Sequence, residues 1–137
     1  MKKTILTLLV ILISTNTLHS ASFNWTKVTT TFDGDTVWYY DKKSVFKVGS
    51  YKFYWQLANY VKNYDEDKSV ISHSMVNCDT YEMKWISYTG YAGHMGKGTI
   101  TFESIVPESN IEYFKWDYFD PKTTSQGAVL KKVCKSR

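Results

Sequence analysis

The chain contains two cysteines, Cys78 and Cys134, and both lie after an N-terminal segment with the features of an export signal. In an oxidising compartment, two cysteines in a small secreted domain most simply form one intramolecular disulfide. The bridge would close a loop of about 56 residues, for which the chain-entropy model gives roughly 4 kcal/mol as an upper value. A metal site or a thiol nucleophile is the alternative, although no closely spaced Cys/His set is present to bind zinc. We therefore expect a small domain whose C-terminus is covalently fastened to its middle.

Residues 1–21 are interpreted as a cleaved signal peptide. Lys2 and Lys3 form a charged start, an apolar run extends from Ile5 to Ile13, and a polar stretch ends at Ala21. The apolar run is about half of the roughly 20 residues that a membrane-spanning helix needs, so a retained anchor is the disfavoured alternative. No cysteine lies near the end of the run, and no lipid-acylated N-terminus is expected. The sequence predicts one mature domain, residues 22–137, in the periplasm, at the cell surface or in the medium, with no transmembrane segment.

Aromatic residues are the most unusual part of the composition, at 17% of the chain. Tyr, Trp and Phe together with Thr and Val favour the half-buried surface of a β-sheet. Tyr and Trp are also enriched where proteins bind one another, so part of this content fits an exposed contact surface.

The formal net charge of +4 falls by two when the signal-segment lysines are removed, and nucleic acid is not an expected partner. The remaining basic residues are scattered, apart from Lys131, Lys132, Lys135 and Arg137 at the C-terminus. We interpret this cluster as a solvated helix end, with an affinity for acidic surfaces as the alternative.

Alternating apolar residues separated by turn signals predict a sheet. The expected strands cover residues 23–31, 36–41, 51–62, 69–78, 81–91 and 99–104, with a further short strand at 42–48. Asp33-Gly34 and Gly49-Ser50 supply the tight turns. The acidic run at 64–68 is expected to be a hairpin loop.

The strand at 51–62 has the clearest alternation. Its odd-numbered residues Tyr51, Phe53, Trp55, Leu57 and Val61 are predicted to face the core. On this interpretation the even-numbered positions, which include lysine and glutamine, face solvent.

Two of the following strands change the parity of their apolar residues. Between Ile71 and Val76 the change predicts a bulge or a strand that is apolar on both sides, and a second bulge is expected near Ile86. Residues 108–120 are ambiguous. The spacing of Ala128, Val129, Leu130 and Val133 predicts a C-terminal helix with Ser125 as its N-cap. The predicted fold is mainly β, in the α+β class: a small curved antiparallel sheet of about six strands with the C-terminal helix packed on it and one disulfide.

No catalytic constellation is found. The loop Gly90–Gly98 has the wrong glycine spacing for a Walker loop and joins two strands, so it does not open a helix. His73 and His94 are the mature histidines, and Ser72 and Ser74 point away from His73 on a strand. We expect no enzymatic activity, no cofactor and no metal.

The order of several motifs resembles the surface-adhesin protein E family of bacteria. These motifs are Trp25, DGDTVWYYD, KVGSYKFYWQLANY, NCD at 77–79 and VCK at 133–135. The resemblance spans almost the whole mature chain and implies a small antiparallel sheet with a C-terminal helix, fastened by a disulfide that corresponds to Cys78 and Cys134. Family members known as adhesins bind host extracellular-matrix proteins and are anchored at the surface by lipid. This chain departs from them in lacking an acylatable N-terminal cysteine.

The main functional hypothesis is an exported, non-enzymatic binding module with a protein partner in the envelope or the host matrix. The alternative is a periplasmic structural or assembly protein that forms a homodimer. A hydrolase or redox protein that uses His73, His94 or a free thiol is a third, weaker hypothesis. The candidate contact residues lie in the glycine loop and in the ambiguous stretch: Tyr91, His94, Met95 and Lys97, together with Tyr113, Phe114, Trp116 and Tyr118.

Overall fold

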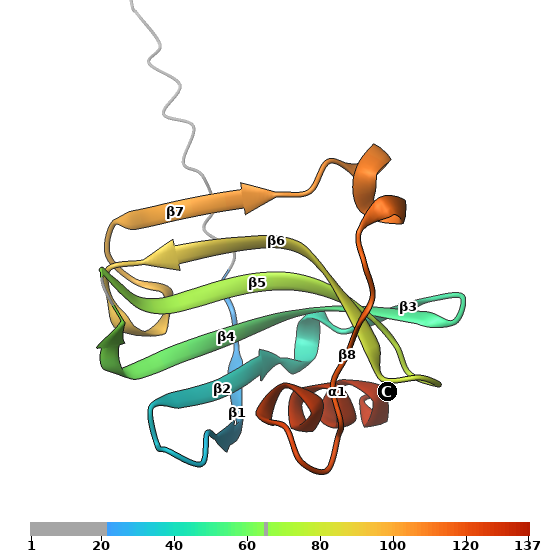
Figure 1. The fold of residues 1–137 in the computed structure, drawn as a ribbon, viewed down its shortest axis with the longest axis horizontal. Coiled ribbons are helices and arrows are strands. Elements are labelled where there is room, and N and C mark those ends of the chain that lie inside the picture. The colour runs from blue at the N-terminus through green and yellow to red at the C-terminus, as the bar shows by residue number, and fades with distance from the viewer. Residues whose placement is uncertain (1–21, 65) are drawn as a thin grey trace, which may run out of the picture.

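The computed structural model describes residues 22–64 and 66–137. The predicted signal peptide lies outside the described residues. One antiparallel sheet dominates the fold, and a single helix, α1 (Ser125–Lys135), packs on it (Figure 1). The strands are β1 (Trp25–Thr30), β2 (Thr36–Asp41), β3 (Phe46–Val48), β4 (Tyr51–Tyr64), β5 (Asp67–Asn77), β6 (Glu82–Tyr91), β7 (Ile100–Ile105) and β8 (Asp117–Tyr118). The predicted fold class is thereby confirmed.

The main path of the sheet contains six strands in the order β1-β2-β4-β5-β6-β7. The short strand β3 pairs with β4, and β8 pairs with β6, which brings the sheet to eight strands. Five of the seven strand pairs follow one another along the chain, as expected for strands joined by short connections. Gly34 and Gly49 have φ values of +77° and +59° in the two predicted turns, a conformation that glycine adopts without strain.

The predicted strand at 42–48 is correct only in its second half. Residues Lys42–Ser44 form a single 3-10 turn, η1, before β3 begins. The Asp41 carboxylate accepts a hydrogen bond from the Lys43 backbone N–H at 3.0 Å, and the Ser44 hydroxyl donates to the Asp41 carbonyl at 2.7 Å. These local bonds compete with extension of the strand.

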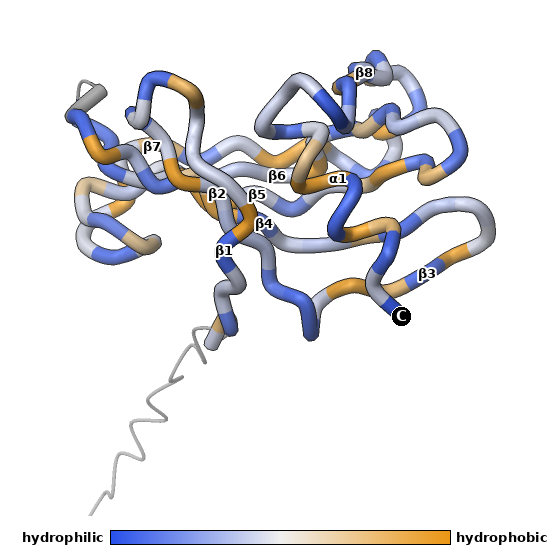
Figure 2. Tube along the Cα trace, turned by 90° about the horizontal axis from the view of Figure 1, so that it is seen from below, coloured by the Kyte–Doolittle hydropathy of each residue, from blue (hydrophilic) through white to orange (hydrophobic). Residues whose placement is uncertain are grey.

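Helix α1 is capped by Thr124, one residue before the predicted cap Ser125. The Thr124 hydroxyl accepts from the Gly127 N–H at 2.9 Å, so Thr124 is the N-cap and Ser125 is the first helical residue. The helix packs against β1, β2 and β4, and Figure 2 shows it beside the sheet, with hydrophobic stretches in both. Val129, Leu130 and Val133 of the helix are fully buried against Tyr54 and other residues of the sheet.

The predicted core face of β4 is correct at Leu57, which is completely buried, but the main core with α1 lies on the other side of the strand. The face of the sheet that packs against α1, here called the helix face, receives the even-numbered residues of β4. Tyr54 and Gln56 are completely buried there, whereas Tyr51 and Val61 on the opposite parity are 37% and 58% exposed. Aromatic residues occupy both parities of this strand, so periodicity alone did not identify the buried side.

Both changes of parity are explained by the register. The pairing of β5 with β4 is continuous from Ser69 to Asn77, so β5 is two-sided: Ile71 and Val76 are buried on opposite faces. The pairing of β6 with β5 skips Ile86, which is the predicted bulge in that strand.

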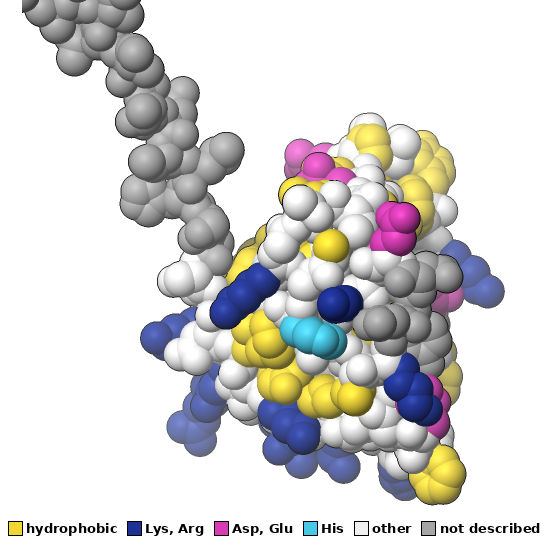
Figure 3. All heavy atoms as spheres, turned by 90° about the vertical axis from the view of Figure 1, so that its left-hand side faces the viewer, with side chains coloured by type: hydrophobic (Ala, Val, Ile, Leu, Met, Phe, Trp, Pro, Cys, Tyr) yellow, Lys and Arg dark blue, Asp and Glu magenta, His cyan; other side chains and the backbone are white. Residues whose placement is uncertain are grey.

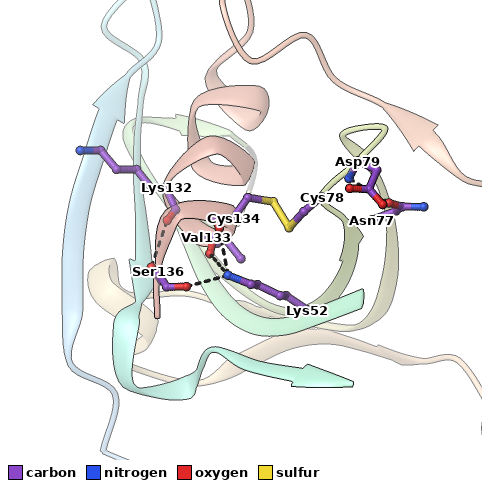
Figure 4. The surroundings of a disulfide bond; sticks show 8 residues. All are labelled: Lys52, Asn77, Cys78, Asp79, Lys132, Val133, Cys134 and Ser136. Carbon is purple, nitrogen blue, oxygen red and sulfur yellow. Dashed lines mark hydrogen bonds between the residues drawn. A yellow bond between two sulfur atoms is a disulfide. The ribbon is translucent and has the colours of Figure 1, made fainter. Parts of the chain in front are cut away.

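The disulfide joins Cys78, the residue directly after β5, to Cys134 in the last turn of α1, and the two Cα atoms are 5.5 Å apart (Figure 4). Among the described residues no cysteine is free, which excludes the thiol and metal alternatives for this pair. No helix within the described part of the chain is long and apolar enough to span a bilayer.

Candidate functional site

A cleft lies on the part of the helix face that α1 leaves uncovered. Its shape follows from a single row of residues that crosses five strands in register: Trp38, Ala58, Val70, Gly90 and Phe102. The two ends of this row carry large rings, whereas its middle carries small side chains. A pleated sheet with this order of sizes has a hollow between two aromatic walls.

The cleft has a volume of about 420 Å³, within the range of ligand pockets in proteins. Five of its residues are aromatic, and hydroxyl groups from serine and tyrosine are interspersed among them. The lining residues are Trp38, Ala58, Tyr60, Val70, Ser72, Trp85, Tyr88 and Phe102. Tyr88 and Phe102 are each 37% exposed and stand at the mouth, with their rings edge to face and centroids 5.8 Å apart.

Gly90 allows the Phe102 ring to lie across β6. A Cβ atom at position 90 would come within 2.3 Å of that ring and 2.6 Å of the Thr101 hydroxyl. A larger residue at this position would therefore displace Phe102 and reshape one wall of the cleft. Gly90 therefore has a role in the shape of the cleft, which the sequence analysis did not assign to it.

The opposite wall contains an unused donor. The indole N–H of Trp38 is buried and has no hydrogen-bond partner in the described part of the structure. A buried donor without an acceptor is costly.

The second face of the sheet carries a continuous stripe of rings. The rings follow one another with centroid separations of 4.6 to 6.2 Å. In order they are Trp25, Phe23, Trp55, His73, Phe53 and Phe46. Most of its rings are half-buried.

Burial lowers the pKa of His73, whose ring stacks on Trp55 at 4.6 Å. The neutral imidazole is therefore favoured. Ser72 and Ser74 lie on the other face, as predicted, and are buried there. Residues 22–64 and 66–137 contain no cluster of three or more His, Cys, Asp or Glu side chains suited to a metal ion.

The glycine loop folds back onto the second face of the sheet. It includes a 3-10 turn, η2 (His94–Gly96). The Met95 N–H donates to the Asn59 side chain at 2.7 Å, and the Gly96 N–H donates to the Ser69 hydroxyl at 2.9 Å. These bonds fix the loop to two neighbouring strands.

The candidate contact residues of this loop differ in exposure. His94 and Lys97 are exposed, whereas Tyr91 and Met95 are half-buried. Figure 3 looks onto the end of the sheet where the loop lies and shows hydrophobic side chains gathered beside a histidine, with lysine or arginine nearby.

The second group of predicted contact residues lies around the 3-10 turn η3 (Glu108–Tyr113) and β8. Tyr113, Phe114 and Tyr118 are 84%, 48% and 61% exposed. Trp116 instead packs on the protein itself: its ring stacks on Tyr51 at 5.5 Å and lies 4.7 Å from the Lys84 ammonium.

The structure does not bring the two predicted groups together, because the glycine loop and η3 lie at opposite ends of the sheet (Figure 1). A binding role for either group remains a prediction. Sequence reasoning missed the cleft, since its row of residues comes from five strands. The one local signal was a glycine inside the strand pattern, which often marks a close approach of another group.

Comparison with known proteins identifies the family. The surface-adhesin protein E family matches residues 25–135. The chain belongs to this family. The selenomethionine form of Haemophilus influenzae protein E is similar in structure, with a TM-score of 0.50 and 15% identity over 79% of this chain and 84% of that one. A second crystal form of the same Haemophilus protein gives a TM-score of 0.47 and 15% identity over 81% and 95% of the two chains. No curated protein sequence matches the chain.

At this level of identity the solved structures support the fold of an adhesin E domain alone. The cleft is described from this chain's own residues. Family membership supports a surface or exported protein with a binding role.

Proposed function

We propose that this member of the adhesin E family is an exported, non-enzymatic module that binds a protein of the host extracellular matrix through the aromatic cleft. The observation that carries the proposal is the hollow between Trp38 and Phe102. Partner proteins bind most strongly through a few large side chains that enter well-packed pockets, and Trp and Tyr dominate such contacts.

The cleft suits an aromatic or aliphatic side chain presented by a partner segment. Its volume of about 420 Å³ accepts one or two large side chains. The hydroxyl-bearing residues Tyr60, Ser72 and Tyr88 are interspersed among the apolar lining residues of the cleft. The class of partner is taken from the adhesin E family, whose members known as adhesins bind host extracellular-matrix proteins at the bacterial surface.

The proposal is tested by binding of the protein without residues 1–21 to an immobilised basement-membrane extract. The double variant Tyr88→Ala/Phe102→Ala removes two rings at the mouth of the cleft. We expect its affinity to fall about tenfold or more, because truncating hot-spot residues costs about 2 kcal/mol or more.

Phe32→Ala is the matched control, because Phe32 is a fully exposed phenyl ring in the β1–β2 turn. Unchanged binding by the cleft variant, or an equal loss with Phe32→Ala, would show that another surface makes the contact. Absence of any binding to the extract would refute the matrix partner.

A homodimer is a second candidate, favoured by the free edge of β7. This strand ends the sheet, and its residues Ile100 and Ile105 are 58% and 65% exposed. Apolar edge strands pair readily with a second copy of the same chain. Light scattering at micromolar concentration distinguishes the two states, and a strictly monomeric protein would eliminate the dimer.

A further inference from the structure

A second recessed surface surrounds the C-terminal end of α1, away from the aromatic cleft. Two hollows of about 400 and 390 Å³ adjoin there, and they share Lys132 and Lys135. The first hollow is lined by Tyr40, Lys42, Lys132, Lys135, Ser136 and Arg137. The second adds Lys131 and partly buried residues of β1 and α1. Together they form a groove with cationic walls, here called the basic groove.

The groove assembles charges that are distant in sequence. Lys42 belongs to η1, directly after β2, whereas the other cations are the lysines in the last turns of α1 and Arg137, two residues after the helix. Lys131 and Lys135 are four residues apart on the helix and therefore neighbours on one side of it. Tertiary structure thus extends the C-terminal cluster into an array of five cationic side chains.

The base of the first hollow is polar. Tyr40 and Ser136 are only 5% and 8% exposed, and their hydroxyl oxygens are 3.3 Å apart. The Ser136 hydroxyl also lies within 3.0 Å of the Lys132 carbonyl, to which it donates. These bonds hold the base of the groove in one arrangement.

The cations of the groove form no ion pair with an acidic side chain of the described residues. Within the described part of the chain, the ion pair between Lys62 and Asp35 involves none of the groove residues. Asp41, the acid next to Lys42, is buried and accepts a hydrogen bond from the Lys43 backbone. The groove therefore presents positive charge to solvent.

Capping of the helix does not explain these side chains, because Lys52 performs that task. Its ammonium donates to the carbonyls of Val133, Cys134 and Ser136 at 3.3, 2.9 and 2.6 Å. Figure 4 shows the Lys52 side chain directed at the end of the helix, whereas the Lys132 side chain points away from it. The exposed lysines of α1 remain available for an external anion.

We propose that the basic groove binds a sulfated polysaccharide chain. A succession of cations along two adjoining hollows matches a polymer with repeated anionic groups better than it matches a single small anion. Val28, Pro121 and Ala128, the apolar residues of the groove, are partly buried and do not protrude. Binding to a membrane surface relies on apolar side chains that insert beside the charges, so a soluble polyanion is favoured over a lipid bilayer.

The probe is a size-defined heparin oligosaccharide, titrated into the protein at several salt concentrations. The variant Lys132→Gln/Lys135→Gln removes the two charges that both hollows share. We expect its affinity to fall about tenfold. The slope of log K against log salt should become shallower by about two, as for the loss of two contacts with a polyanion. Chemically desulfated oligosaccharide should bind the unchanged protein about tenfold more weakly.

The control Lys68→Gln/Lys115→Gln makes the same change in net charge outside the groove and should alter affinity by about twofold or less. An equal loss in both double variants would overturn the proposal in favour of a net-charge effect. Equal binding of desulfated oligosaccharide, or no binding of heparin, would also overturn it. Capture by phosphatidylglycerol vesicles that heparin does not compete away would assign the groove to a lipid surface.

Discussion

Gln56 in the middle of β4 and Gln126 in the first turn of α1 exchange two hydrogen bonds across the interface between sheet and helix. The Gln56 amide donates to the Gln126 oxygen at 3.2 Å, and the Gln126 amide donates back at 2.9 Å. Both side chains are buried, at 0% and 6% exposure. The pair fixes the helix in register with the sheet, because a shift of either element would leave buried amide groups without partners.

Replacing one member of this pair should be more harmful than replacing both. Gln56→Met keeps the volume but removes the donor to the buried Gln126 oxygen and leaves the Gln126 amide only the Tyr54 hydroxyl at 3.5 Å, at a cost of about 1–3 kcal/mol in the free energy of unfolding. The double variant Gln56→Met/Gln126→Met should recover most of that loss. Urea denaturation of the three proteins measures the coupling, and costs that simply add would contradict it.

Lys52→Met should destabilise the C-terminal end of α1. The variant leaves three carbonyl groups without the donor they share, and we expect a loss of about 1–3 kcal/mol. Backbone amides of the last helical turn should also exchange faster with solvent. Lys47→Met, an exposed lysine of β3, is the control and should stay within about 0.5 kcal/mol of the original protein. Equal stability of the two variants would exclude the cap.

Loss of the disulfide should have a large effect on a domain of this size. The bridge spans 56 residues in sequence, and removal of such a bond from a small secreted domain costs about 2–5 kcal/mol. We expect Cys78→Ser/Cys134→Ser to unfold at lower urea and to be insensitive to reductant. When the original protein is reduced, its urea midpoint of unfolding should fall towards that of this variant. A midpoint unaffected by reductant in the original protein would contradict the assignment.

His73 should make stability depend on pH. Burial lowers its pKa in the folded state from the ordinary value of 6.5. The unfolded state therefore binds the proton more readily, so the contribution is complete above about pH 6.5 and is lost as the pH falls through the lowered value. Unfolding free energies at pH 5 and pH 7 should differ less in His73→Gln than in the original protein. The same comparison for the exposed His94→Gln is the control, and identical differences in all three proteins would refute the role of His73.

Much of the fold was predictable from the sequence because its signals are local. Gly34 and Gly49 mark turns in which a positive φ is required, and Ser125 marks the start of the helix to within one residue. The parity change near Ile86 indicated the bulge of β6. Each of these depends on residues within a few positions of one another.

The core face of β4 could not be predicted in the same way. Lys52 and Gln56 are polar, yet both lie on the helix face, because groups of α1 satisfy their hydrogen bonds. Those partners are 70 or more residues away along the chain. The alternation of apolar residues therefore did not indicate the side that packs against α1, in a strand whose aromatic residues occupy both sides.

The sequence by itself determined the disulfide pair, the β-rich class, the hairpins and the C-terminal helix. Two cysteines allow only one intramolecular pairing, and turn residues and the periodicity of apolar residues act over short ranges of sequence. The tertiary structure alone decided which side of the sheet the helix covers and where the candidate sites lie. Trp38 and Phe102 form the walls of one cleft only because five strands align in register, and Lys42 joins the lysines of α1 only because the helix packs beside β2. Register and packing are set by the sum of many long-range contacts, which no local pattern contains.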